Sequence, residues 1–466
     1  MNRKQYSLLT LLMCISSFSI GQPFNCSSHV FVPRSISTDL TYINWGIFYN
    51  LHCGAKDKTF TYAGQFIYQN SRKSRGLGAG FLLGTNNTVT IQQAPFAPGT
   101  PDVINSVSLG LGTTPPAAPF SELFSIQPER KIFAYQGYFY ANLDTWWCGL
   151  WADASFAIVN AVHRLNALEL GTMSTLCPGI LGVCDALNNP SLKFGKFFCG
   201  LCNDEKRRTG FDDFQVRLGY NYDWCDSILG VYLIGTVPSG RKPTAEFVFE
   251  PLVGSKHGSI GVGFQGFLPI DLCGCPDSCL TLMTDFNWRF VFSHRECRTF
   301  DLLPNGPFSR FLPLVTLANP LFTIPGVNLL TQKVRVQPRN TIQWWLGLDY
   351  EFCDLNFEFG YNLWWRQKER ISTDSITVPA NVSIFDLSGA GTFTPLTLAN
   401  ININSAVAGR GLTNKVYGAF SWGGCICDGC FDWMSGLGAS YEFVAKHDRC
   451  NALSYWAAFG KVAVSF

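Results

Sequence analysis

The chain has little charge and no long unbroken apolar run. Charged residues fill only 15% of its 466 positions, against about 25% in an average soluble domain. The formal net charge is +2 and no basic patch stands out, which argues against a nucleic-acid-binding protein. The longest later uncharged stretch, near residues 312–330, contains three prolines, which would break a helix. Aromatic residues reach 15%, which excludes a disordered chain. The protein must therefore hide much apolar surface without membrane helices.

Catalytic motifs are also scarce. The chain has six histidines and contains neither HExxH nor the GxSxG nucleophile turn. Ser255, His257 and Ser259 crowd together, but the sequence places no acidic partner beside them. Residues 261–266 (GVGFQG) fit GxGxxG formally, yet they lie within a strand pattern and no helix follows, so they do not predict a phosphate site. We therefore expect no enzymatic activity, no cofactor and no bound metal.

Residues 1–21 are predicted to be a secretory signal peptide. Arg3 and Lys4 precede an uncharged core at residues 8–20, and small residues precede the expected cleavage site. The core is shorter than the roughly 20 residues that span a bilayer, which argues against a retained anchor. Removing 21 of the 466 residues leaves 445, with no net charge and without Cys14, so that 17 of the 18 cysteines remain. An exported chain with so many cysteines indicates an oxidising compartment and disulfides, and their odd number leaves at least one cysteine free or paired between chains.

The later sequence alternates with period two, which indicates β-strands with one apolar and one polar face. Residues 213–222, 282–292 and 356–365 show the pattern most clearly. A soluble β-sandwich also alternates. However, these strands are about ten residues long, close to the 9–11 that cross a bilayer when tilted. Aromatic residues also gather at strand ends, as at Trp344-Trp345 and Trp364-Trp365, which suits interfacial girdles.

The fold class predicted is all-β, a transmembrane up-and-down antiparallel barrel over residues 22–466 with long external loops. Residues 454–466 end in Phe466, which we interpret as the terminal strand that serves as the signal for barrel assembly. Thirteen strands are expected near residues 41–52, 59–69, 132–143, 149–159, 211–222, 226–236, 257–267, 279–292, 341–350, 356–367, 415–422, 433–444 and 454–466.

The number of strands follows from parity. Short periplasmic turns alternate with long external loops in such barrels, so an upward strand must precede residues 41–52, and residues 29–37 are the available segment. This gives about 14 strands. An extra pair at residues 76–83 and 103–111 would give 16. A long loop folded inward would narrow the pore.

The polar face of the strands is expected to line a water-filled pore. The candidate pore-lining residues are Asp213, Arg217, Asp285, Arg289, Asp349, Glu358, Glu442 and Lys461. Carboxylates outnumber bases in this set by five to three, which hints at a mild cation preference unless loop charges overturn it.

All six predicted periplasmic turns contain cysteine. The disulfide candidates at this rim are Cys53, Cys148, Cys225, Cys273, Cys275, Cys279, Cys353, Cys425, Cys427 and Cys430. Cys26 lies near the N-terminus, and the remaining cysteines fall on the outer side: Cys177, Cys184, Cys199, Cys202, Cys297 and Cys450. We expect rim cysteines to join neighbouring turns or molecules. The CxC and CxxC spacings leave a metal site as the alternative, although export favours oxidation.

Signal, barrel strands, cysteine-bearing turns, long loops and a terminal Phe together resemble the cysteine-rich major outer-membrane porins of the Chlamydiales and their environmental relatives. A more distant similarity links the chain to the disulfide-linked major outer-membrane protein of Legionella. The resemblance covers the layout of the whole mature chain and contains no sharp motif. It implies a general-diffusion porin, a homo-oligomer such as a trimer, and disulfides that support the envelope.

The sequence therefore predicts an outer-membrane porin for small hydrophilic solutes, with intermolecular disulfides. Its expected partners are outer-membrane lipid, the barrel-assembly machinery and further copies of the chain, with no nucleic acid. The alternatives are a surface adhesin or antigen barrel, because the loops at residues 70–131 and 368–414 are rich in Thr, Asn, Pro and Ala, and a transporter of apolar solutes. A gated, energy-coupled receptor would need a larger plug domain than residues 22–40.

Overall fold

The computed structural model describes most of the chain beyond the predicted signal peptide, which lies outside the described residues. The described residues are 26–46, 59–92, 102–109, 121–170, 182–199, 205–224, 227–270, 278–316, 319–352, 354–385, 393–426 and 431–466. No helix within these ranges is long and apolar enough to cross a bilayer.

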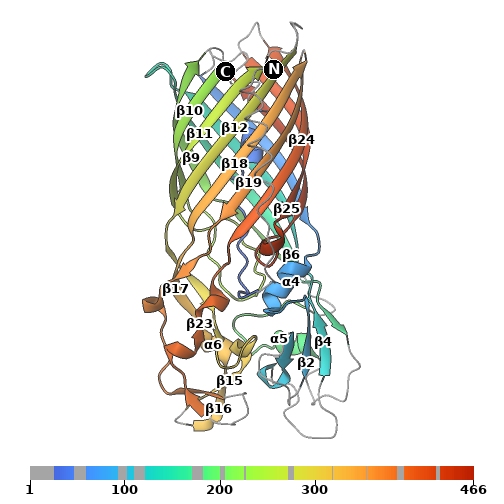
Figure 1. Ribbon diagram of the computed structural model, residues 1–466, viewed down its shortest axis with the longest axis vertical. Coiled ribbons are helices and arrows are strands. Elements are labelled where there is room, and N and C mark those ends of the chain that lie inside the picture. The colour runs from blue at the N-terminus through green and yellow to red at the C-terminus, as the bar shows by residue number, and fades with distance from the viewer. Residues whose placement is uncertain are drawn as a thin grey trace, which may run out of the picture.

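Twelve antiparallel strands close into a barrel (Figure 1). The strands are β1 (Phe60–Ser71), β5 (Glu129–Asn142), β6 (Leu150–Arg164), β9 (Phe214–Trp224), β10 (Ser227–Val237), β11 (Ser259–Ile270), β12 (Ser278–Val291), β18 (Arg339–Phe352), β19 (Leu355–Arg366), β24 (Gly411–Ile426), β25 (Phe431–Val444) and β26 (Tyr455–Ser465). The first and last strands pair over their whole length, from Thr61 opposite Ser465 to Ser71 opposite Tyr455. One further strand, β8 (Glu205–Phe211), pairs with the end of β6 outside the closed ring.

These twelve strands confirm twelve of the thirteen expected from periodicity, and the count of about 14 is wrong. The two segments that made up the difference, residues 29–37 and 41–52, form no strand in their described parts. The first is extended chain, and the second begins in a short helix, α2 (Leu40–Asn44). Their described parts lie inside the barrel, where apolar and polar residues alternate for a different reason: this stretch of chain contacts apolar and polar wall residues on all sides.

The prediction of an extra pair of strands, which would have given 16 strands, is also wrong. Residues 75–82 form a helix, α4 (Arg75–Leu82), which Ser74 caps by accepting a hydrogen bond from the Leu77 amide. Strand β3 (Val103–Asn105) has only three residues and joins a small sheet outside the barrel. The glycines of α4 permit close packing, since a Cβ at Gly80 would lie 2.7 Å from the Cys450 carbonyl oxygen.

The two faces of the wall differ as the alternation predicts. On β9, Val216, Leu218 and Tyr220 are exposed while Gln215 and Arg217 are buried. The tryptophan pairs divide in the same way, because neighbouring residues on a strand point to opposite faces: Trp345 and Trp364 are buried inside the barrel. Each pair therefore places one residue, not two, on the outer face of the wall.

The connections are unequal at the two ends. Short turns lie at the end that carries the C-terminus, and the long connections at the other end fold into a cap, which is the lower half of Figure 1. The helices of the cap, besides α4, are α5 (Val183–Leu187) and α6 (Gly326–Leu330). Its strands, besides β3, are β2 (Thr88–Gln92), β4 (Ser121–Ser125), β7 (Leu168–Leu170), β13 (His294–Thr299), β14 (Asp301–Leu302), β15 (Pro313–Thr316), β16 (Asn319–Pro325), β17 (Thr331–Gln337), β20 (Arg370–Ile371), β21 (Val382–Phe385), β22 (Phe393–Pro395) and β23 (Ile401–Asn402).

The cap is a folded body and not a set of loose loops. Its strands form four small sheets. One apolar core gathers around Phe124, Phe197 and Phe308, and another around Phe300, Leu314 and Val336.

The apolar outer face predicts a cost for charge at mid-barrel. Leu437 lies at the middle of β25 and its side chain is 64% exposed. If this face contacts lipid, Leu437→Arg should lower the free energy of unfolding in lipid vesicles by about 2–4 kcal/mol. Leu303, an exposed leucine of the cap, supplies the control, because Leu303→Arg should change it by no more than about 0.5 kcal/mol. Equal effects of the two substitutions would contradict a lipid-facing wall.

Candidate functional site

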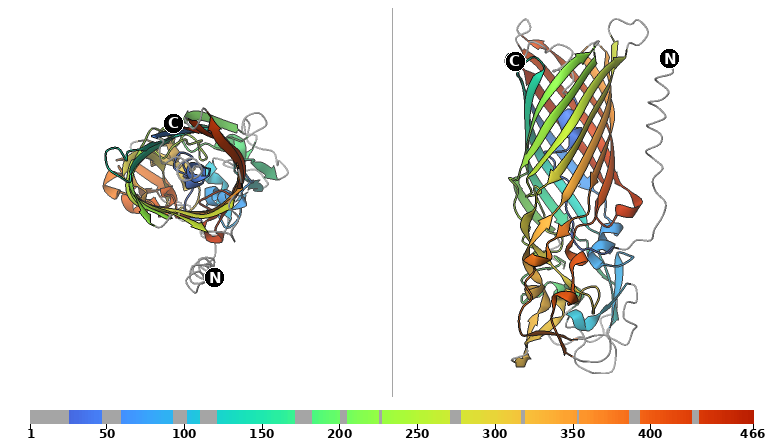
Figure 2. Two further views of the ribbon diagram at one scale, coloured as in Figure 1. Left: turned by 90° about the horizontal axis from the view of Figure 1, so that it is seen from above. Right: turned by 60° about the vertical axis from the view of Figure 1, so that its left-hand side comes forward.

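The N-terminal segment, residues 26–46, runs through the inside of the barrel and is called the plug below. Seen from above in Figure 2, this blue segment lies within the ring of strands. Its hydrogen bonds reach inward-facing side chains on many strands, among them Gln65 on β1, Gln343 on β18 and Lys461 on β26. A plug this small suffices because twelve strands enclose a narrow lumen, and long inward side chains fill the rest.

The cap end of the plug is tied to the cap. A disulfide joins Cys26 to Cys450, in the connection between β25 and β26. The Ser28 hydroxyl and the His29 amide both donate hydrogen bonds to the Ser405 carbonyl, at 3.2 and 3.1 Å. This end therefore has a covalent tether, while every other plug contact described below is noncovalent.

A buried cluster of four charges holds the centre of the plug. Arg34 and Asp39 of the plug pair with each other at 2.9 Å, and Lys415 on β24 pairs with Asp39. Glu442 on β25 lies opposite Lys415 in the ladder and forms an ion pair with it at 3.3 Å. Arg34 reaches Glu442 at 3.8 Å, so two cations and two carboxylates alternate. All four side chains are 8% exposed or less.

Helix α2 starts within this cluster and packs its aromatic side chains on the wall. Asp39 caps the helix by accepting from the Thr41 amide at 3.0 Å. Tyr42 and Trp45 pack against Phe459 on β26, with ring centroids 5.5 and 5.0 Å away. The Trp45 indole donates to Gln65 at 2.7 Å.

The last turn of the plug is fixed by charged wall residues. Lys461 donates to the carbonyls of Ile43 and Trp45, which end the short helix. The Gly46 amide donates to Glu358 at 2.8 Å, and Asn44 donates to Asp285 at 2.9 Å. The wall thus binds the free carbonyls and amides of the plug as well as its side chains.

The eight predicted pore-lining residues are all buried. Four of them contact the plug directly: Asp285, Glu358, Glu442 and Lys461. Arg217 joins Asp285 to Asp153 by ion pairs of 2.9 and 2.7 Å. Asp349 lies beside Glu358 in the ladder, while Asp213 and Arg289 lie at the cap end. Their role as a channel lining stays a prediction.

Sequence reasoning missed Arg34, Asp39 and Lys415. Lys415 could have been found, since its place opposite Glu442 puts it on the inward face of β24. The plug residues could not, because the segment was interpreted as wall.

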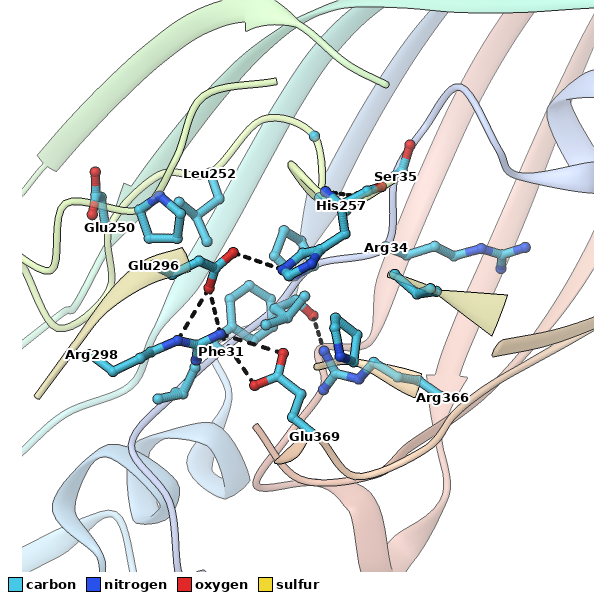
Figure 3. A pocket seen from close by; sticks show the side chains of 18 of the residues that line it. Phe31, Arg34, Ser35, Glu250, Leu252, His257, Glu296, Arg298, Arg366 and Glu369 are labelled. Atoms are coloured by element: carbon cyan, nitrogen blue, oxygen red, sulfur yellow. Dashed lines mark hydrogen bonds and ion pairs between the residues drawn. The ribbon is translucent and has the colours of Figure 1, made fainter. Parts of the chain in front are cut away.

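A cavity of about 160 Å³ lies where the plug enters the barrel from the cap. It is lined on one side by the plug and on the others by the cap end of the wall and by β13 (Figure 3). Apolar walls come from Phe31, Phe249, Leu252 and Trp364. A single water needs only about 10–15 Å³ measured in this way, so the cavity has room for several waters or for a small organic molecule.

A chain of charges borders the cavity (Figure 3). His257 bonds Glu296 at 2.8 Å and the Phe292 carbonyl at 2.8 Å. Arg298 pairs with the other oxygen of Glu296 at 2.7 Å and with Glu369 at 3.2 Å. Burial disfavours the charged forms of His257 and Glu296, but their hydrogen bond and opposite charges, together with Arg298, outweigh this effect. The pKa of His257 is raised, and Arg298 and His257 lower the pKa of Glu296 to about 2.

The cysteines are only partly described. Besides Cys26–Cys450, a disulfide joins Cys184 to Cys199 in the cap, so Cys199 is not available as a metal ligand. Among the rim candidates, Cys148 and Cys279 are free thiols within the single chain, and Cys148 is exposed. The side chains of the other rim candidates lie outside the described residues.

No model of a known protein family matches the chain, and no curated protein matches it. Among solved structures it is similar to an outer-membrane channel from Pseudomonas putida F1, at 11% identity over 89% of this chain and 97% of that one, with a TM-score of 0.39. The transport unit of the autotransporter AIDA-I from Escherichia coli matches at 7% identity over 89% and 92%, with a TM-score of 0.32. A FadL homologue from Pseudomonas aeruginosa matches at 10% identity over 87% and 89%, with a TM-score of 0.28. Such low scores say nothing of what this chain does.

The His257–Glu296 pair predicts a pH dependence of the cap. A raised histidine pKa stabilises the folded state below the ordinary value of 6.5, and this contribution is lost as pH rises through the raised value. The carboxylate contributes in the opposite direction, but only as pH falls toward about 2. Hydrogen exchange of the β13 and β17 amides, corrected for intrinsic rates, should therefore show protection that decreases above pH 6.5. His257→Gln should remove that slope.

His447, a half-exposed histidine elsewhere in the cap, provides the matched control. His447→Gln should keep the wild-type slope in β13 and β17. If the protection of β13 and β17 still decreased above pH 6.5 in His257→Gln, the His257–Glu296 pair would not be the cause of the pH dependence.

Proposed function

We propose that the protein is an outer-membrane channel for small hydrophilic solutes and that the structure is its closed state. The observation that carries the proposal is that a polar lumen is closed by a separate segment of chain and not by collapse of its own wall. The apolar outer face supports a place in a bilayer, because charge there is costly. The predicted porin fits this proposal, with the plug taking the part expected of an inward-folded loop.

The plug is attached in a way that suits a gate. Within residues 26–46 its one disulfide lies at the cap end, and its remaining contacts are ion pairs, hydrogen bonds and packing. Movement of the inner half would expose Asp285, Glu358, Glu442 and Lys461 to water. Solvating these charges offsets part of the cost of breaking their pairs.

We also propose the homo-oligomer with intermolecular disulfides that the resemblance to the Chlamydiales porins implies. The exposed thiol of Cys148, in the short turn between β5 and β6, supports it. Disulfide links at that rim would join neighbouring barrels without touching the plug.

Planar-bilayer recordings test the channel and the gate together. Asp39→Asn leaves the wall unchanged and keeps a helix-capping residue, but removes the plug carboxylate that pairs with Arg34 and Lys415. Losing one partner of a buried ion pair costs about 3–5 kcal/mol. The variant should therefore raise the open probability at least tenfold above wild type.

Asp374→Asn, the same substitution at an exposed aspartate of the cap, should leave the open probability unchanged. Equal open probabilities for the two variants would contradict the plug as gate. The absence of channels in wild type and in Asp39→Asn, with binding to host cells retained, would replace the channel with an adhesin.

A further inference from the structure

Three inward side chains at the cap end of the wall form a row. Arg289 on β12 lies opposite Thr341 on β18, and Thr341 lies opposite Arg366 on β19. Strands in a sheet are about 4.8 Å apart, so the two arginines begin about 10 Å apart with the threonine between them. All three line the cavity described above.

The donors of this row are incompletely used. Among the described residues Arg289 makes one hydrogen bond, at 3.4 Å to Gln215, and Arg366 donates to the carbonyls of Val32 and Gly409 at 3.1 Å each. The Nε of each arginine and the Thr341 hydroxyl are buried without a partner. Among the described residues, no carboxylate forms an ion pair with either arginine, although their exposures are only 5% and 3%.

Three other buried arginines of the molecule pair with carboxylates, whereas Arg130, also buried, has no carboxylate partner among the described residues and donates to His163 and to the Leu252 carbonyl. Arg217, Arg298 and Arg310 each pair with an aspartate or glutamate at 2.9 Å or less. Burying a cation without a partner is costly. Two such cations beside one cavity therefore indicate that an anion completes the site.

The carboxylates around the cavity do not supply that anion. Glu296 and Glu369 are bound by Arg298, and Glu250 is bound by Arg208 at 2.8 Å. Asp213 accepts from the Ser255 amide at 2.7 Å and keeps one oxygen without a partner. Of these carboxylates only Asp213 has an oxygen without a partner, whereas neither Arg289 nor Arg366 forms an ion pair among the described residues.

We propose that this row binds the carboxylate of a small amphipathic acid whose apolar part lies against Phe31, Phe249, Leu252 and Trp364. The planar fork of arginine matches a carboxylate, and the threonine hydroxyl adds a third donor. The apolar walls favour an organic acid over an inorganic anion. This deepens the proposed function by naming the solute class that meets the closed channel at its cap end.

Calorimetric titration of the full-length protein in detergent with benzoate tests the site. Wild type should bind benzoate, and Arg289→Gln and Arg366→Gln should each weaken binding at least tenfold. Arg295→Gln removes the same charge from an exposed position on β13 and should bind as wild type does. Benzyl alcohol, similar in size but uncharged, should bind at least tenfold more weakly than benzoate.

Three outcomes would overturn the inference: unchanged benzoate affinity in both arginine variants, equal binding of benzyl alcohol, or equally tight binding of inorganic phosphate. Arg366→Gln removes the hydrogen bond from Arg366 to Val32 of the plug and can therefore fail to fold. In that case Arg289→Gln and the comparison with benzyl alcohol still test the inference. Binding is measured without conduction. Channels without benzoate binding would therefore reject this site alone, and benzoate binding without channels would reject the proposed function alone.

Discussion

The buried charges shared by plug and wall are the constraint on which the closed barrel depends. Arg34 and Asp39 enter the lumen on the plug, and Lys415 and Glu442 face them from the wall. Removing these groups from water costs several kcal/mol per ion, and mutual pairing offsets that cost only when the geometry is good. The plug can therefore occupy one position well, and neighbouring positions would leave charges unpaired. Packing of Tyr42 and Trp45 on Phe459 then stabilises the same position.

The need of buried charges for partners also distinguishes two parts of the lumen. In its middle, cations and carboxylates of plug and wall form ion pairs with one another, and the chain blocks its own passage. At the cap end, Arg289 and Arg366 keep unused donors beside a cavity. A solute of opposite charge in this cavity would contact these groups and the cap end of the plug together. The cap, with His257 and Glu296 at its edge, frames that entrance.

The wall could be predicted from the sequence, and the lumen could not. Strand periodicity reports which face of a strand is apolar, and this placed twelve strands and their inward residues, from Arg217 to Lys461. It fails for residues 29–46, because a segment surrounded by wall also mixes apolar and polar residues. The parity rule then forced a fourteenth strand. Pairing across the lumen, such as Asp39 with Lys415 over 376 positions, leaves no trace in local sequence.

The cap was underestimated for a related reason. Its strands are mostly shorter than eight residues, too short for a clear alternation, so they were expected to be loops. Five of the six predicted turns that placed the rim cysteines join barrel strands, and the sixth, at residues 53–58, lies outside the described residues. The two disulfides found in the described residues nevertheless lie in or at the cap. Cysteine positions marked the turns without indicating which cysteines pair.

Photo-crosslinking from inside the plug tests its position most directly. The photoreactive residue p-benzoylphenylalanine in place of Tyr42 would lie near Phe459, whose ring centroid is 5.5 Å from that of Tyr42. In membranes, with the chain diluted to prevent contact between copies, irradiation should link residue 42 to the β26 peptide of the same chain. Links to the cap alone, to other molecules alone, or to no wall strand would contradict a plug inside the barrel.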